Sequence, residues 1–182
     1  MRFTKLIWKL KYLCNKLNNP FIKKLLIQIY NFLLDSKGSY IGHNSVFKGL
    51  PIFPHGINSV FISGGSAFGE NCVIFQQVTI GSNTLPGSNI GSPTIGDNCY
   101  IAAGAKIVGN ITIGNNVRIG ANCVVFKDVP DNAVVVLNSP RIIVKEKSNN
   151  NRFYQMKGGK LGYVNNGSWR EETDPSILQQ FG

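Results

Sequence analysis

Residues 94–126 read TIGDNCYIAAGAKIVGNITIGNNVRIGANCVVF, a stretch with an aliphatic residue at every sixth position. These positions are Ile95, Ile101, Ile107, Ile113, Ile119 and Val125. A six-residue aliphatic period is neither the period of an α-helix nor the alternation of a simple strand. It is typical of a left-handed parallel β-helix, in which each hexapeptide forms one side of a triangular prism and the aliphatic side chain points inward.

The same spacing occurs in two runs further upstream, at Ile41, Phe47 and Phe53 and at Ile62, Phe68, Ile74 and Ile80. Three of the four cysteines lie four residues after an inward-pointing residue: Cys72, Cys99 and Cys123. The prism requires a small buried side chain at this fifth position of each hexapeptide. Because free cysteine behaves as a small hydrophobe, we expect these thiols to pack in the core. Residues 41–137 have room for about five coils of the prism.

The chain of 182 residues has room for one principal domain with appendages. We predict a mainly β protein with N-terminal helices in residues 1–38, the β-helix in residues 39–145 and a polar C-terminal tail in residues 146–182. The first segment predicts an amphipathic helix over residues 3–17, followed by a second helix from Pro20 to about Leu34. We also expect an extended strand over residues 133–144.

Positive charge is concentrated at the N-terminus. The net charge of the chain is +10, and residues 1–37 hold eight Lys and Arg residues against a single acidic residue, Asp35. The rest of the chain is close to neutral for its length, which argues against a nucleic-acid partner. The basic helix has two interpretations, a cap over the open end of the β-helix or attachment of residues 1–18 to an anionic membrane surface. The cap is the favoured one, and both can hold.

The sequence lacks the features of a metalloprotein and those of a secreted or membrane-spanning protein. There are only two histidines, His43 and His55, and no CxxC pair, so we predict no metal site. We find no signal peptide, and the longest apolar stretch, residues 21–34, is interrupted by Lys23 and Lys24 and is too short to span a bilayer. We therefore expect a cytoplasmic protein, with the inner face of the membrane as a possible site of attachment.

Two insertions interrupt the six-residue period. The step from Phe53 to Ile62 is nine residues long and contains Pro54-His55-Gly56-Ile57-Asn58, and a longer excursion covers residues 81–93. Insertions in a solenoid become surface loops, and such loops commonly carry function. His55 is the candidate general base, although a lone histidine can also be an ordinary solvent-exposed loop residue.

The order of motifs resembles that of the hexapeptide-repeat acyltransferases. The motifs are Pro54-His55-Gly56-Ile57-Asn58, Phe75-Gln76-Gln77-Val78-Thr79-Ile80-Gly81, Pro93-Thr94-Ile95-Gly96-Asp97-Asn98 and Ile101-Ala102-Ala103-Gly104-Ala105-Lys106-Ile107. The resemblance is greatest to the serine acetyltransferase-like branch, which includes bacterial capsule and exopolysaccharide O-acetyltransferases. It implies that His55 is the catalytic base, that the protein is a homotrimer, and that acetyl-CoA lies between neighbouring prisms.

The resemblance also gives candidate binding residues. The phosphates of CoA require cations or N–H groups, and the candidates for CoA contact are Ala102, Ala103, Gly104, Lys106 and Arg141. Lys106 can equally be an ordinary exposed corner lysine. The candidates for acceptor contact are Asn58, Gln76 and Ser92.

This chain departs from the serine acetyltransferases at three places. Tyr40 stands where those enzymes carry the aspartate that orients the histidine, Pro54 replaces a second aspartate, and Ser92 lies where they have an Arg-His-Pro loop. Without the first aspartate, we expect a backbone carbonyl to hold the second ring nitrogen of His55. An amino-acid acceptor needs charged partners, so the sequence favours a sugar hydroxyl of a bacterial surface polysaccharide or of its nucleotide- or lipid-linked precursor. The alternatives are a serine O-acetyltransferase and a non-catalytic trimeric β-helix that binds or scaffolds.

Overall fold

The structure is a computed structural model that describes residues 2–86, 89–138, 150–165 and 167–181. The chain forms two compact units, Met1–Ser139 and Pro140–Gly182. The first unit contains two helices and a stack of short strands, and the second contains a small antiparallel sheet with a short helix.

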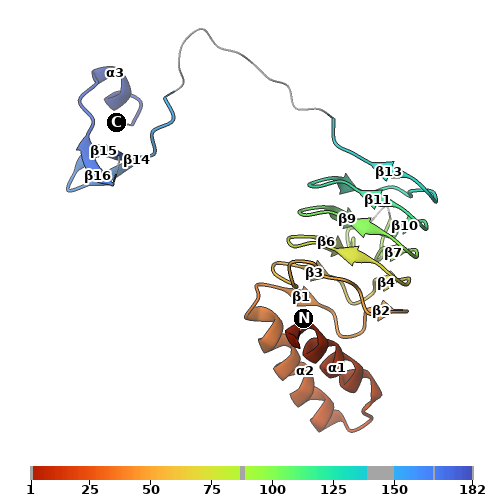
Figure 1. The fold of residues 1–182 in the computed structure, drawn as a ribbon. Coiled ribbons are helices and arrows are strands. Elements are labelled where there is room, and N and C mark those ends of the chain that lie inside the picture. Colours follow the sequence, from red (N-terminus) through yellow and green to blue (C-terminus); the bar gives the residue numbers. More distant parts are fainter. Residues whose placement is uncertain (1, 87–88, 139–149, 166, 182) are drawn as a thin grey trace. The chain divides into compact units, whose positions relative to one another are not determined.

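The stack of the first unit consists of coils that pass through three parallel sheets among the described residues (Figure 1). Sheet 1 contains β1 (Tyr40–Ile41), β3 (Phe61–Ile62), β6 (Thr79–Gly81), β9 (Lys106–Val108) and β12 (Val124–Val125). Sheet 2 contains β2 (Val46–Phe47), β4 (Ala67–Phe68), β7 (Thr94–Ile95) and β10 (Thr112–Ile113). Sheet 3 contains β5 (Val73–Ile74), β8 (Tyr100–Ile101), β11 (Arg118–Ile119) and β13 (Val134–Val135).

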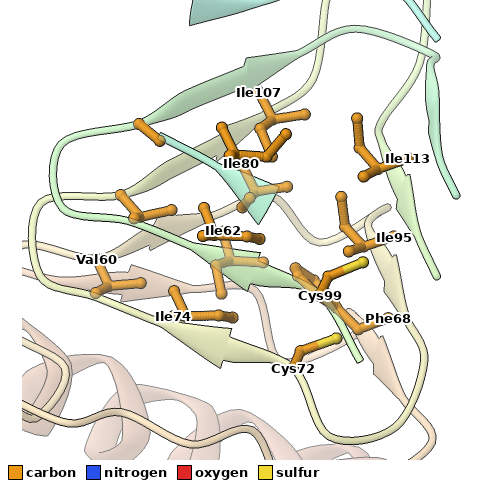
Figure 2. Packing of buried hydrophobic residues seen from close by; sticks show 14 of the residues in the cluster. Val60, Ile62, Phe68, Cys72, Ile74, Ile80, Ile95, Cys99, Ile107 and Ile113 are labelled. Carbon is orange, nitrogen blue, oxygen red and sulfur yellow. The ribbon is translucent and has the colours of Figure 1, made fainter. Parts of the chain in front are cut away.

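The register of the strands places the repeated aliphatic residues directly above one another. In sheet 3, Ile101 pairs with Ile74 on one side and with Ile119 on the other, and all three side chains are fully buried. Figure 2 shows buried side chains of successive coils inside the prism, among them Ile62, Ile80 and Ile107 of sheet 1, together with Cys72 and Cys99. The prediction of a left-handed parallel β-helix is confirmed, and so is the packing of Cys72, Cys99 and Cys123 in its core.

Asparagines form the edge between sheets 2 and 3. Asn71, Asn98, Asn116 and Asn132 have positive φ angles of 55° to 60°, in the left-handed region that asparagine tolerates well. Their side-chain amides form a ladder, in which each donates to the next at 3.1–3.2 Å. These residues therefore turn the chain at successive coils and link the coils to one another.

Two helices close the first coil, as the cap interpretation predicts. They are α1 (Arg2–Lys16) and α2 (Pro20–Asp35), which lie side by side next to β1 (Figure 1). Asn19 caps α2 by accepting hydrogen bonds from the backbone N–H groups of Phe21 and Ile22. Both predicted helices are confirmed, within two residues at each end. None of the helices in the described part of the chain is long and apolar enough to cross a membrane.

Polar contacts attach this cap to the β-helix. Lys11 is only 6% exposed, and its Nζ donates to backbone oxygens of the first coil, at Gly42, His43 and Ser45. The hydroxyl of Tyr30 donates to the backbone oxygen of Ile41 at 2.7 Å. Since carbonyl groups at an open solenoid end would otherwise lack partners, these bonds replace those that a preceding coil would make.

The buried Lys11 predicts a pH dependence of stability. Burial lowers its pKa from 10.5 to about 8. Between these two values the unfolded chain binds more protons at this position than the folded chain, so the free energy of unfolding rises with pH. We expect the wild type to gain stability from pH 8 to pH 10.5 relative to Lys11→Met, which has no titrating group at this position. Urea unfolding of both proteins measures the difference, and a difference that stays constant with pH would contradict the prediction.

The C-terminal part differs from its sequence-based expectation. Of the strand expected over residues 133–144, the structure has only β13, and residues 139–144 lie outside the described residues. The expected polar tail contains an antiparallel sheet of β14 (Tyr154–Lys157), β15 (Lys160–Asn165) and β16 (Ser168–Glu171), followed by α3 (Pro175–Leu178). Tyr154 donates to the carboxylate of Glu172 at 2.7 Å, and Arg152 lies 3.3 Å from the same carboxylate. The tail is thus held by its own side chains.

Candidate active site

His55 lies on the short insertion between the first and second coils and its side chain is exposed to solvent. Gly56 follows with a φ of 74°, a left-handed conformation that favours glycine. The side-chain amide of Asn58 donates to the backbone oxygen of His55 at 2.9 Å. The loop that carries the histidine is therefore fixed by its own residues, and Asn58 contributes through its side-chain amide.

The imidazole of His55 is oriented by a side chain from the next coil. Its Nδ1 lies 2.8 Å from Oε1 of Gln76, and its ring packs edge-on against Phe75 with 5.4 Å between the ring centroids. Because the carbonyl oxygen of a glutamine can only accept, this contact favours the neutral tautomer with the proton on Nδ1 and the lone pair on Nε2. The expectation of a backbone carbonyl at this ring nitrogen was wrong, since the side-chain amide of Gln76 takes that place.

Gln76 belongs to the corner that joins β5 of sheet 3 to β6 of sheet 1. The next residue, Gln77, has a φ of 61°, although asparagine occupies this left-handed conformation along the neighbouring edge of the prism. Its backbone is held on two sides, because its N–H donates to the oxygen of Asn58 at 3.2 Å and its oxygen accepts from Nζ of Lys106 at 2.9 Å. Uncommon backbone conformations that are held in this way cluster at functional sites.

The corner of the following coil continues the same edge. The N–H of Gly104 donates to the oxygen of Gln76 at 3.1 Å, and Gly104 itself has a φ of 72°. A Cβ atom at this position would lie only 2.0 Å from Oδ1 of Asn122, so only glycine fits here without a shift of Asn122. Lys106 donates to the oxygens of Gln77 and Gly104, both at 2.9 Å. The structure thus brings His55, Asn58, Gln76, Gly104 and Lys106 together on one edge of the prism, which we call the His55 edge.

One predicted site residue, Ser92, does not join this edge within one chain. Oγ of Ser92 bonds to Oγ of Ser63 at 2.9 Å, at the corner between β3 of sheet 1 and β4 of sheet 2. This corner belongs to a different edge of the prism, so Ser92 can approach His55 only from another copy of the chain. Arg141 lies outside the described residues.

A cavity beside the His55 loop involves residues that the sequence did not suggest. It has a volume of about 280 Å³ and is lined by Thr4 and Lys5 of α1 and by residues 50–54. The lining is largely apolar, and among these residues only Lys5 is charged. No sequence signal could have placed α1 beside Pro54, because their proximity depends on how the cap packs. The described residues contain no group of three or more His, Cys, Asp or Glu side chains that could hold a metal ion.

Comparison with known families connects this architecture to transferases. Residues 92–127 match the family described as bacterial transferase hexapeptide (six repeats). The serine acetyltransferase of Staphylococcus xylosus is 48% identical over 94 residues, which are 50% of this chain and 41% of that protein. That of Synechococcus elongatus is 44% identical over 91 residues, which are 50% of this chain and 36% of that protein. The chain therefore spans less than half the length of these relatives.

Solved structures show the same relationship. Serine acetyltransferase isoform 3 of Entamoeba histolytica, in complex with cysteine, superposes with a TM-score of 0.61 at 30% identity, over 77% of this chain and 50% of that one. Serine acetyltransferase of Neisseria gonorrhoeae, in complex with serine, gives 0.62 at 29% identity, over 72% and 53%. A serine acetyltransferase in complex with CoA gives 0.57 at 28% identity, over 69% and 48%.

Proposed function

Because the β-helix of this chain belongs to the hexapeptide-repeat acyltransferases, on the serine acetyltransferase-like branch, we propose that the protein is an acetyl-CoA-dependent O-acetyltransferase with His55 as its general base. The observation that carries the proposal is the contact of 2.8 Å between Nδ1 of His55 and Oε1 of Gln76. In the neutral imidazole this contact favours the proton on Nδ1 and leaves Nε2 with the lone pair that a general base requires.

The proposed reaction is a direct transfer. Nε2 of His55 accepts the proton of the acceptor hydroxyl while the hydroxyl oxygen forms a bond to the acetyl carbon. The bond between that carbon and the CoA sulfur breaks, and the proton passes from His55 to the departing sulfur. The described residues of the His55 edge offer no serine or cysteine beside the imidazole, which supports direct transfer over an acetylated enzyme.

The His55 edge fits the chemistry that CoA requires. Lys106 is a cation on this edge, and its ammonium has a third N–H beyond those that donate to Gln77 and Gly104. Ala102, Ala103 and Gly104 present backbone with little side-chain bulk, which suits close approach of an extended pantetheine arm. Arg141 stays a candidate for phosphate contact on the resemblance alone. When bound, acetyl-CoA would supply the acetyl group as a reactive thioester.

We further propose that the active form is a homotrimer, with CoA sites between neighbouring prisms. In a single chain His55 is exposed, whereas catalysis of acyl transfer is favoured by exclusion of water. A second prism against the His55 edge would cover it and could bring Ser92 of another copy near the imidazole. The mass in solution by light scattering tests this assembly, and a monomer at micromolar concentration would contradict it.

Two acceptors are supported by different observations. The comparisons favour serine, because the relatives and structural neighbours are named serine acetyltransferases. The residues favour an uncharged sugar hydroxyl, because Tyr40, Pro54 and Ser92 replace the charged residues of those enzymes. A surface polysaccharide or its precursor therefore remains our proposal for the acceptor, with serine as the second candidate.

Acceptor preference is measured by thiol release from acetyl-CoA with serine, free sugars, nucleotide sugars and glycan fragments. We expect transfer to at least one sugar and little O-acetylserine at millimolar serine. Efficient formation of O-acetylserine would identify serine, and not a sugar, as the acceptor. Thiol release with none of these acceptors, from a folded trimer that binds CoA, would support a non-catalytic scaffold.

Gln76 gives a test of the proposed orientation of His55. Gln76→Leu removes the acceptor at Nδ1, and the loss of one hydrogen bond is expected to lower kcat/KM about 5- to 30-fold. Gln76→Glu keeps an acceptor oxygen and adds a negative charge that favours the protonated imidazole, so the acidic limb of the pH profile should move to higher pH. Equal kcat/KM in the wild type and in Gln76→Leu would show that Gln76 does not position the base.

A further inference from the structure

One face of α2 leaves large apolar side chains uncovered. Five of them are exposed: Phe21 by 84%, Ile22 by 50%, Leu25 by 57%, Ile29 by 42% and Phe32 by 73%. Their positions along the helix fall within about 100° of its circumference, so they form one continuous stripe. On the opposite face, Tyr30 and Leu34 are fully buried in the core cluster. We call the five exposed residues the α2 stripe.

We propose that the α2 stripe inserts into the surface of an anionic membrane. The argument for a lipid surface is charge complementarity. The segment that contains the stripe, residues 1–37, has eight basic residues and one acidic residue. Among the described residues, no lysine of this segment lies within 4.0 Å of a carboxylate. Apart from the buried Lys11, their charge is therefore available to a partner. An exposed apolar helix face within a strongly basic segment is typical of helices that lie in a membrane interface.

The same charge disfavours a second copy of the chain as the occupant. Two such segments placed face to face would bring strongly positive surfaces together, and like charges across an interface are destabilising. An anionic lipid surface has the opposite effect, because each basic residue near it is attracted.

The structure assigns membrane contact to a different helix from the one that the sequence suggested. The expectation was residues 1–18, which include Trp8. Trp8 packs against Phe47 and Phe53, with 5.3 and 5.6 Å between ring centroids, and Lys11 points at the first coil. Trp8 and Lys11 of α1 are therefore engaged with the first coil, whereas the α2 stripe is exposed.

The test is co-flotation of the full chain with vesicles of equal parts phosphatidylglycerol and phosphatidylcholine, compared with vesicles of phosphatidylcholine alone. We expect binding to the anionic vesicles at low salt and much weaker binding to the neutral ones. Phe21→Ser/Phe32→Ser should lower the partition coefficient about 10- to 100-fold, because two large apolar side chains no longer enter the bilayer. Both side chains are exposed, so the variant should keep the fold.

Two further variants separate the contributions. Phe126→Ser removes a phenylalanine that is 60% exposed on the β-helix and should leave vesicle binding unchanged. Lys23→Gln/Lys24→Gln should weaken binding to anionic vesicles and leave binding to neutral vesicles unaffected.

Three results would overturn the proposal. The first is no binding of the wild type to anionic vesicles at low salt. The second is equal binding of the wild type and Phe21→Ser/Phe32→Ser to anionic vesicles, which would show that the interaction depends on charge alone. The third is that the wild type does not bind vesicles but self-associates beyond the trimer, and that Phe21→Ser/Phe32→Ser abolishes this self-association. That result would assign the α2 stripe to contact with a second copy of the chain. Binding is read without acetyl transfer, so none of these results depends on the proposed function.

Discussion

Replacing His55 with alanine is expected to lower kcat/KM for acetyl transfer about 10²- to 10⁴-fold, the usual contribution of a general base. The imidazole is held by Gln76 through Nδ1, so Nε2 is the atom that takes the hydroxyl proton in the proposed mechanism. Alanine offers no proton acceptor at this place, and water would have to substitute for it. Thiol release from acetyl-CoA, with the best acceptor of the wild type, measures the loss.

The second histidine of the chain provides a matched control. His43, the other histidine, lies in the first coil away from the His55 edge, and burial lowers the pKa of its imidazole. His43→Ala should retain the kcat/KM of the wild type, and both variants should retain the circular dichroism spectrum, since His55 is exposed. Unchanged turnover in His55→Ala would exclude this residue as the base.

Replacing Ile101 with alanine is expected to lower the free energy of unfolding by about 2–5 kcal/mol. Ile101 has no exposed surface and pairs with Ile74 and Ile119 in the coils on either side. The strands fix the spacing of the coils, so the structure cannot collapse around the cavity that the smaller side chain leaves. Urea unfolding measures the effect.

Leu85→Ala is the control for this prediction. It also removes carbons from an aliphatic side chain, but Leu85 is 73% exposed in the loop between β6 and β7. Exposed substitutions of this kind usually change stability by no more than about 0.5 kcal/mol. Similar losses in Ile101→Ala and Leu85→Ala would contradict the stacked core as the main source of stability.

Local sequence was sufficient to predict the β-helix and the position of the candidate base. The six-residue period from Ile95 to Val125 fixes which side chains point inward, because each hexapeptide is one side of the prism. The break in this period between Phe53 and Ile62 predicts the loop that carries His55. The C-terminal sheet was missed, because apolar and polar residues alternate only in the four residues of β14 and not in β15 or β16, and few residues of these strands are buried.

The partner of His55 could not be predicted in the same way. Gln76 is 21 residues away, and its contact with His55 depends on the alignment of two coils of unequal length. From the sequence, Gln76 was a candidate for contact with the acceptor substrate, whereas its position favours a role in positioning the imidazole. A hydrogen bond between side chains requires alignment within a few tenths of an ångström, which periodicity cannot give.

By itself, the sequence determined the period of the coil, the inward residues and the loop that carries His55, because these depend on neighbours within six residues of one another. It also determined that α2 is a helix with apolar residues around most of its circumference, but such a pattern cannot say which face packs. Only the tertiary structure decided that Tyr30 and Leu34 face the core while the α2 stripe faces solvent, and that Gln76 and Lys106 join His55 on one edge. Both outcomes depend on contacts between segments that are distant in the sequence, and these contacts exist only once the coils and the cap are packed together.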